Sequence, residues 1–163
     1  MPYTINQHLD YSIWANGRIA ETLEGLEDYL LYEEIKSSFS SIEKTLLHIW
    51  DAEDVWLRRL QGESPTEFLS KSFNGDKPEL LKGFRQSSVD LKNFIDKKGP
   101  DFLQETIHFK TIKGAPFSSP VEEILFHVVN HGSFHRGQIV TILRELGVKE
   151  LPETDLIFYL RMK

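Results

Sequence analysis

The sequence predicts an all-α protein: an antiparallel four-helix bundle with a long crossover connection and a short extended excursion before the last long helix. Three observations favour this fold. Apolar residues recur at helical spacing in four long segments. Capping residues, proline or glycine bound these segments. The chain shows no sustained strand–helix–strand pattern, which argues against a doubly wound sheet.

The first two predicted helices are amphipathic. Apolar residues at helical spacing follow Thr4, a suitable N-cap, so residues 5 to about 26 are predicted to form the first helix. The second helix is expected to open at Ser40, with Glu43 completing a capping box, and to stop at Gly62.

A connection over residues 62–76 separates the second helix from the third. It carries Gly, Pro, Ser and Asn without periodicity, and it is long enough to cross the bundle. Asp76 and Glu79 then form another capping box, and apolar residues at helical spacing continue the third helix to Gly99.

In the next segment the residue pattern changes from helical spacing to the alternation of a strand. Residues 102–118 alternate β-favouring residues around Lys113 and Gly114, which predicts a short hairpin or extended excursion. Two strands alone are marginally stable, so this excursion is expected to pack on the bundle.

Three successive signals mark the start of the last long helix. Ser119 is a suitable N-cap, Pro120 fits the first turn and Glu122 completes a capping box. The helix is expected to run to Leu146, and a short terminal helix is expected within residues 154–163.

Length and composition limit the functional classes. The 163 residues are expected to form one helical-bundle domain, residues 1–163. The net charge of -6 has the wrong sign for neutralising phosphates, so no nucleic-acid partner is expected. No signal-peptide pattern or membrane-length apolar run occurs, so we expect a cytoplasmic protein without a membrane partner. Without cysteine, any metal must be held by His, Asp or Glu.

Two histidines interrupt the apolar seam of the last long helix. Seam positions step by four and three residues, and they are occupied by Ile124, Val128, His131, His135, Gln138 and Ile142. An unpaired buried polar group costs about 1–3 kcal/mol, so these polar side chains need partners. His131 and His135 are i,i+4 neighbours with Cβ atoms ~5–6 Å apart, close enough to share one ion.

His48 is the third candidate ligand. It lies mid-way along the second helix beside an apolar stripe, so it can enter the same core from a facing helix. A catalytic ion usually has three protein ligands and one open position. His48, His131 and His135 are therefore predicted to hold one divalent metal ion. The alternative is three core histidines bonded to one another, to Gln138 or to buried water.

The other histidines carry different expectations. His127 lies four residues before His131 but falls off the seam, so we expect it to support a ligand or line a wall. His8 and His108 lie in segments without a matching partner, so we expect them to be surface or structural residues.

Two other metal-site signatures do not fit. A zincin needs His-Glu-x-x-His, whereas residue 132 is Gly and residues 131–135 contain no Glu. A di-iron bundle needs Glu-x-x-His on long helices, and the match from Glu105 to His108 lies in the strand-like excursion.

Several segments together resemble the DinB-like family of small bacterial helical proteins. HVVNHGSFHRGQIVTILRELG at 127–147 resembles its most characteristic motif, and LLHIWDAEDVW at 46–56 resembles its second-helix histidine region. YSIWANGRI at 11–19 resembles its opening, and IHFKTIKGAPFSSPVEEILFH at 107–127 resembles the stretch before the motif helix. The family has no kinship with the DNA polymerase of the same name.

The resemblance implies properties that the residues alone do not give. It implies a bundle that is often dimeric, so we expect a homodimer, with zinc or nickel on side chains corresponding to His48, His131 and His135. Family members of established activity are transferases and isomerases that use low-molecular-weight bacterial thiols, whereas many others carry only a hydrolase label. A small-molecule substrate and a thiol cofactor are therefore expected, but the reaction is not fixed.

Two classes of function follow. The first is a metal-dependent enzyme, thiol S-transferase-like or hydrolase-like, in which the ion lowers the pKa of an external thiol or water. The absence of cysteine suits the thiol version, because no internal thiol competes. The second is a non-enzymatic stress-response or binding protein whose metal holds two helices together. A fourth protein ligand would favour the second class, and an open position beside a pocket would favour the first.

A hydrolase also needs a proton acceptor. Asp51, Glu53 and His127 are the candidates near the predicted ligands, with a solvated helix face as the alternative for the two acids. Arg136 either binds an anionic group or pairs with an acid on a helix. The sequence leaves these alternatives open, so the catalytic residues are unknown at this point.

Overall fold

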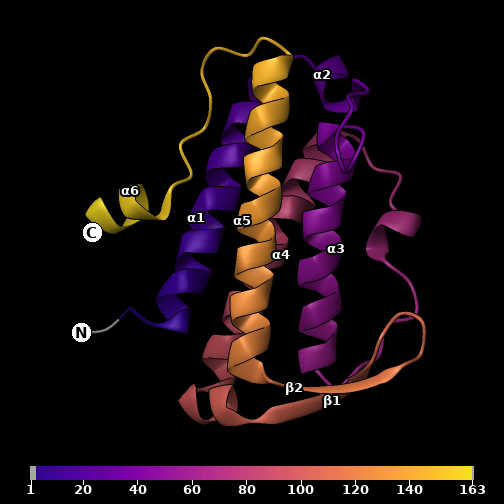
Figure 1. The fold of residues 1–163 in the computed structure, drawn as a ribbon, viewed down its shortest axis with the longest axis vertical. Helices are drawn as coiled ribbons and strands as arrows, with labels where there is room; N and C mark the ends of the chain where they lie inside the picture. The colour runs from indigo at the N-terminus through magenta and orange to yellow at the C-terminus, as the bar shows by residue number, and fades with distance from the viewer. Residues whose placement is uncertain (1–2, 163) are drawn as a thin grey trace.

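The computed structural model describes residues 3–162. Four long helices form a bundle (Figure 1): α1 (Ile5–Glu24), α3 (Ile42–Leu60), α4 (Lys77–Lys98) and α5 (Val121–Glu145). The shorter elements are α2 (Tyr29–Tyr32), the 3-10 turns η1 (Leu69–Lys71) and η2 (Pro100–Gln104), the strands β1 (Thr106–Lys110) and β2 (Pro116–Pro120), and α6 (Leu156–Arg161). This architecture confirms the predicted all-α four-helix bundle. Within residues 3–162, every helix is too short or too polar to cross a bilayer.

The long crossover connection determines the helix directions. α1 and α5 run one way and α3 and α4 the other, while α1 and α3 each pack against both α4 and α5 (Figure 1). Residues 61–76 return along α3 before α4 begins, which is the crossover predicted from this segment. Asp51 of α3 anchors it, because its carboxylate accepts hydrogen bonds from the backbone N–H, at 2.8 Å, and the hydroxyl of Ser70.

Capping residues and glycines set most of the helix ends. The Thr4 side chain caps α1, and Asp76 with Glu79 forms the predicted capping box of α4. Gly62 and Gly99 follow α3 and α4 with φ of 92° and 82°, in the left-handed region that a side chain disfavours. The predicted stop signals are therefore confirmed at these two ends.

Two predicted helix starts are wrong. Ser41, not Ser40, caps α3, because its hydroxyl accepts from a backbone N–H in the first turn. Ser119 and Pro120 lie in strand β2, so neither the predicted side-chain cap nor its capping box forms at α5. The first backbone N–H of α5 donates instead to the carbonyl of Glu105, so pairing with the hairpin replaces the cap.

The predicted excursion is an antiparallel hairpin. β1 pairs with β2 around Gly114, whose φ is 87°. Phe109 of β1 is buried and packs edge-on against Trp56 of α3, with ring centroids 5.1 Å apart. The hairpin crosses one end of the bundle beside α3 and α5, and this contact supplies the surface that two strands need (Figure 1).

A polar layer divides the core into two apolar clusters. One cluster includes residues 5–15 of α1 and 121–129 of α5, and the other includes residues 19–23 and 139–143 of the same helices. Each long helix contributes buried polar side chains between them: Ser12, Asn16, Glu53, Ser87 and Arg136. The middle of the bundle is therefore held by hydrogen bonds rather than by apolar contacts alone.

Asn16 joins the two charged groups of this layer. Its Oδ1 accepts from Nη1 of Arg136 at 2.8 Å, and its Nδ2 donates to Oε1 of Glu53 at 3.2 Å. Glu53 also accepts from the Ser87 hydroxyl, and Arg136 donates to Ser12 at 3.3 Å. Burial raises the pKa of Glu53 to about 7, against the opposing effects of Ser87, Arg136 and Asn16.

The substitution Glu53→Gln tests this layer through pH. Folding raises the pKa of Glu53 from 4.5 to about 7, so the folded state binds the proton of this side chain more tightly than the unfolded state does. The resulting stabilisation is fully present below the pKa of Glu53 in the unfolded chain. That contribution is lost as the pH rises through about 7. From about pH 6 to about pH 9 the wild type should lose roughly 1.4 kcal/mol of unfolding free energy relative to Glu53→Gln. Urea denaturation measures the difference, and identical pH profiles would contradict the described burial.

Candidate metal centre

Helices α3 and α5 bring the three predicted histidines together beside the polar layer. His131 and His135 lie one turn apart on α5, and His48 faces them from α3. One ligand nitrogen from each ring lies within 4.8 Å of the other two. Within residues 3–162 this group contains no Asp or Glu, so the three rings are its entire donor set.

The spacing of the rings suits one small divalent ion. Nε2 of His131 lies 3.0 Å from Nε2 of His48. The ring centroids are 4.5 to 4.8 Å apart in all three pairs. Two nitrogens bound at ~2.0–2.1 Å to a tetrahedral ion lie roughly 3.3 Å apart, so the donors need only small rotations to converge.

The environment keeps two of these rings neutral. Burial lowers the pKa of His131 to about 4, with further lowering by His135, His48 and His127. Burial also lowers the pKa of His48, followed by the effect of His135. Nδ1 of His131 is buried without a hydrogen-bond partner, so nothing nearby stabilises a second proton on that ring. Neutral imidazole is the form that binds metal, and the site therefore fits a divalent ion near neutral pH.

Gln138 and Phe39 position two of the rings. Nδ1 of His135 donates to Oε1 of Gln138 at 2.7 Å, which leaves Nε2 of His135 as the free ligand atom. Nε2 of Gln138 donates in turn to the Ser38 hydroxyl at 3.1 Å. Phe39 stacks on His48, with ring centroids 4.2 Å apart. The segment between α2 and α3 therefore covers one side of the centre.

No local pattern in the sequence predicts this cover. Phe39 lies in a serine-rich connection without helical or strand periodicity, so sequence reasoning missed it. Gln138 was visible as a polar residue in the seam, but its role as the partner of His135 depends on side-chain geometry.

His127 lies beside the centre and outside the three-histidine group. Its exposed ring is 5.8 Å from the ring of His131 and 5.8 Å from that of Trp56. It is therefore the candidate proton acceptor that remains both near the ligands and open to solvent.

The two candidate acids are buried and engaged by other partners. Asp51 and Glu53 are 5% and 3% exposed, so the alternative of a solvated helix face is wrong for both. Asp51 holds Ser70 of the crossover, and Glu53 belongs to the polar layer. Their partners occupy the oxygens that a proton acceptor would use.

Arg136 was placed off the seam, yet it is only 1% exposed. Its guanidinium donates to hydroxyl and amide oxygens of Ser12, Asn16 and Ser133. Within residues 3–162 it makes no direct ion pair with a helix acid, and its burial does not suit binding of an external anion. The physical reason is that α5 packs against both α1 and α3, which buries a wider arc than one seam.

The sequence model that defines the DinB family matches residues 1–163 of this chain. The protein DinB of Bacillus subtilis (strain 168) is 29% identical over 160 residues, covering 94% of this chain and 91% of that protein. The family model therefore spans all the helices described above, including the segments that carry the three histidines.

Solved structures share the fold. A DinB-like protein from Bacillus cereus ATCC 10987 aligns with a TM-score of 0.70 at 22% identity, covering 94% of this chain and 99% of that one. The DinB-like protein YjoA from Bacillus subtilis aligns with a TM-score of 0.67 at 17% identity, covering 91% and 97%. YfiT from Bacillus subtilis, described as a probable metal-dependent hydrolase with an unusual four-helix bundle topology, aligns at 0.66 with 14% identity, covering 89% of each chain.

Metal binding should depend on His135 and not on His108. His135→Ala removes one of three converging donors, so affinity for zinc should fall more than about 100-fold. His108 lies on β1 with its ring bonded to Ser118, so His108→Ala should bind like the wild type. Competition with a chelator measures both constants, and equal losses in the two variants would exclude the assigned centre.

Gln138→Leu should weaken metal binding without removing a ligand. The substitution deletes the acceptor for Nδ1–H of His135 and frees that ring to rotate, so affinity should fall by roughly 10–100-fold. The same chelator competition gives the value, with Thr141→Val one turn further along α5 as the matched control. Unchanged affinity in Gln138→Leu would show that the hydrogen bond does not position His135.

Proposed function

The chain belongs to the DinB family, and from this premise and the three-histidine centre we propose a metal-dependent enzyme that activates a water or an external thiol. The ligands are His48, His131 and His135. The proposed substrate is a small molecule.

One observation carries this proposal: three histidines converge without a fourth His, Asp or Glu in the same group among residues 3–162. A structural ion is usually enclosed by four protein ligands, whereas a catalytic ion keeps one position for water or substrate. His48 and His131 are only half-buried, so that position can face solvent. The donor set therefore favours catalysis over a metal that only ties helices together.

The protein side chains prepare the site for a nucleophile. A divalent ion bound here would lower the pKa of a coordinated water or thiol. The lowered pKa of His131 and of His48 keeps both rings free of protons that would compete for the ligand nitrogens. Gln138 orients His135, and Phe39 shields one side of the centre from water.

His127 is our candidate for moving the proton. Its ring is exposed and lies 5.8 Å from His131, so it can accept a proton from an incoming water through one bridging solvent molecule. This supports the hydrolytic form of the proposal. YfiT, the structural relative described as a probable metal-dependent hydrolase, supports the same chemistry by analogy of fold.

The thiol-dependent form rests on a separate observation. The chain has no cysteine, so an external thiol meets no internal competitor at the ion. A hollow of about 310 Å³ next to the centre, lined in part by Phe134 and Gln138, has room for a small thiol or acceptor. The nucleophile in this form is the thiolate rather than hydroxide.

A paired assay tests the proposal. Zinc-loaded and metal-free protein are incubated with activated esters, and separately with a small thiol and an electrophilic acceptor. We expect metal-dependent turnover in one of the two assays, lost in the variant with His48, His131 and His135 all replaced by Ala. His127→Ala should lower a hydrolytic rate roughly 10²-fold while retaining the metal, because it removes only the proton acceptor.

The two assays also separate the alternatives. Turnover of esters alone would establish water as the nucleophile, and consumption of thiol alone would establish the transferase form. Full metal loading without turnover in either assay, together with a cobalt spectrum that thiols leave unchanged, would favour the structural-metal alternative.

A further inference from the structure

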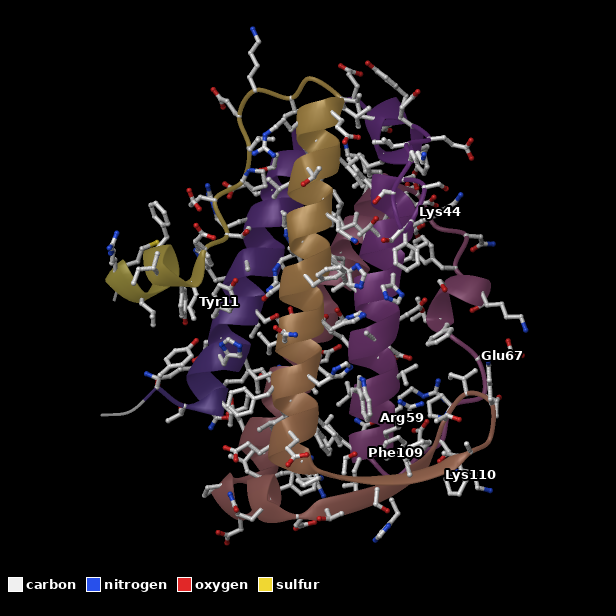
Figure 2. All side chains as sticks on the ribbon, viewed as in Figure 1. Tyr11, Lys44, Arg59, Glu67, Phe109 and Lys110 are labelled. Atoms are coloured by element: carbon white, nitrogen blue, oxygen red, sulfur yellow. The ribbon has the colours of Figure 1, made fainter. Side chains whose placement is uncertain are left out.

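Arg59 of α3 has an unusual environment for a cation. Its guanidinium carbon lies 4.6 Å from the ring centre of Trp56 and 4.8 Å from that of Phe109. Figure 2 shows Arg59 and Phe109 together at the end of α3 that meets the hairpin. The residue is only 7% exposed, so the charge is held between two aromatic faces and largely out of water.

No anion partner accompanies this buried charge. Among residues 3–162, no hydrogen bond or ion pair to the Arg59 guanidinium is found, and its buried Nε has no hydrogen-bond partner. Burial alone lowers the pKa of Arg59, and no acidic residue counteracts it. The neighbouring Arg58, by contrast, pairs with Glu63 at 2.7 Å and Asp54 at 3.8 Å. The acids of this region therefore serve Arg58 and leave Arg59 unpaired.

A hollow with further positive charge lies next to Phe109, one of the two rings that hold the guanidinium. The hollow has a volume of about 470 Å³ and is lined by Ser64, His108, Phe109, Lys110, Pro116, Phe117 and Ser118. Phe109 is shared between this hollow and the contact with Arg59. The lining contains a lysine, a histidine and two hydroxyl groups, and it contains no carboxylate. This composition suits an anion and would repel a cation.

A row of rings connects Arg59 with the histidine centre. Trp56, which carries the guanidinium on its face, contacts His127, and His127 contacts His131, with centroids 5.8 Å apart in both pairs. Arg59 is eleven residues after His48 on the same helix, roughly 16 Å along the axis. An extended small molecule that follows α3 could therefore reach both places.

We propose that Arg59, held between Trp56 and Phe109, is an oxyanion-binding site that takes the carboxylate or phosphate of a small molecule. Guanidinium presents parallel N–H donors that match two oxygens of such a group, and it stays charged when buried. Only Nε is both enclosed and unpartnered, so the ligand approaches Nη1 and Nη2. The anion is either a free one or the acidic end of the substrate of the metal centre.

Inorganic phosphate is the first probe, added to metal-free protein at constant ionic strength set with chloride. At about ten times its Kd, phosphate should raise Tm by roughly 3–6 °C and change the tryptophan fluorescence, because Trp56 contacts the site. Arg59→Gln should abolish both responses, and Arg58→Gln, at the adjacent and only partly exposed arginine, should retain them. A wild type that does not respond, or an Arg59→Gln protein that responds equally, would overturn the proposal.

Two further measurements complete the test. If Arg59→Gln does not fold, Arg59→Lys is used in its place. The lysine ammonium keeps the charge but lacks the planar pair of N–H donors, so it should bind phosphate roughly tenfold more weakly. Unchanged affinity in Arg59→Lys would overturn the guanidinium site. If Arg59 only stabilises the fold by packing between the two rings, its variants should have a lower Tm and the wild type should not respond to phosphate. That result would overturn the proposal. Because these titrations need no metal, their outcome is independent of the proposed enzymatic function.

The source of the anion is resolved on cobalt-loaded protein. An extended ligand with a thiol at one end and a carboxylate at the other is compared with a short neutral thiol, using the cobalt spectrum. If the site receives the acidic end of the substrate, the extended ligand should bind at least about tenfold more tightly, and Arg59→Gln should remove the gain. Equal affinities, with phosphate binding retained, would assign the site to a free anion.

Discussion

The buried contacts of Asn16 with Glu53 and Arg136 constrain the whole bundle. An arginine that is 1% exposed and a glutamate that is 3% exposed are tolerable only while their hydrogen bonds are made. Asn16 donates to one and accepts from the other, so α1, α3 and α5 must keep one axial register. Gly132 adds a steric condition, because a Cβ there would lie 2.9 Å from Nη1 of Arg136. The polar layer therefore specifies one alignment among those that apolar packing would allow.

The candidate metal centre depends on this alignment. His131 and His135 lie one residue before Gly132 and Arg136, so the polar layer that fixes α5 also fixes the height of two rings. His48 is held in the same way, because α3 is aligned through Glu53 five residues later. The layer and the centre occupy adjacent faces of the same helices. A ligand nitrogen displaced by one helical turn would no longer lie within reach of the other two.

The connections between helices add chemistry to this scaffold. The segment before α3 brings Phe39 over His48, and the crossover is tied to Asp51. The hairpin lies across the end of the bundle that is farther from α2, and it places the ring of Phe109 against the guanidinium of Arg59. The bundle therefore carries a nitrogen-lined centre in its middle and an unpaired cation at one end. In one small molecule, a reactive group would be bound by metal coordination at the three histidines, and an acidic group would be bound by the charge of Arg59.

Local signals in the sequence determined the helices, most of their ends and the pairing of His131 with His135, because capping bonds and i,i+4 spacing act over a single turn. The sequence also placed His48 in a helix that could face them. Tertiary structure alone decided that Arg136 is buried and that Phe39 covers the centre, since burial depends on which helices are neighbours. Such contacts join residues that no periodicity relates, so the chain specifies them only through the packed fold.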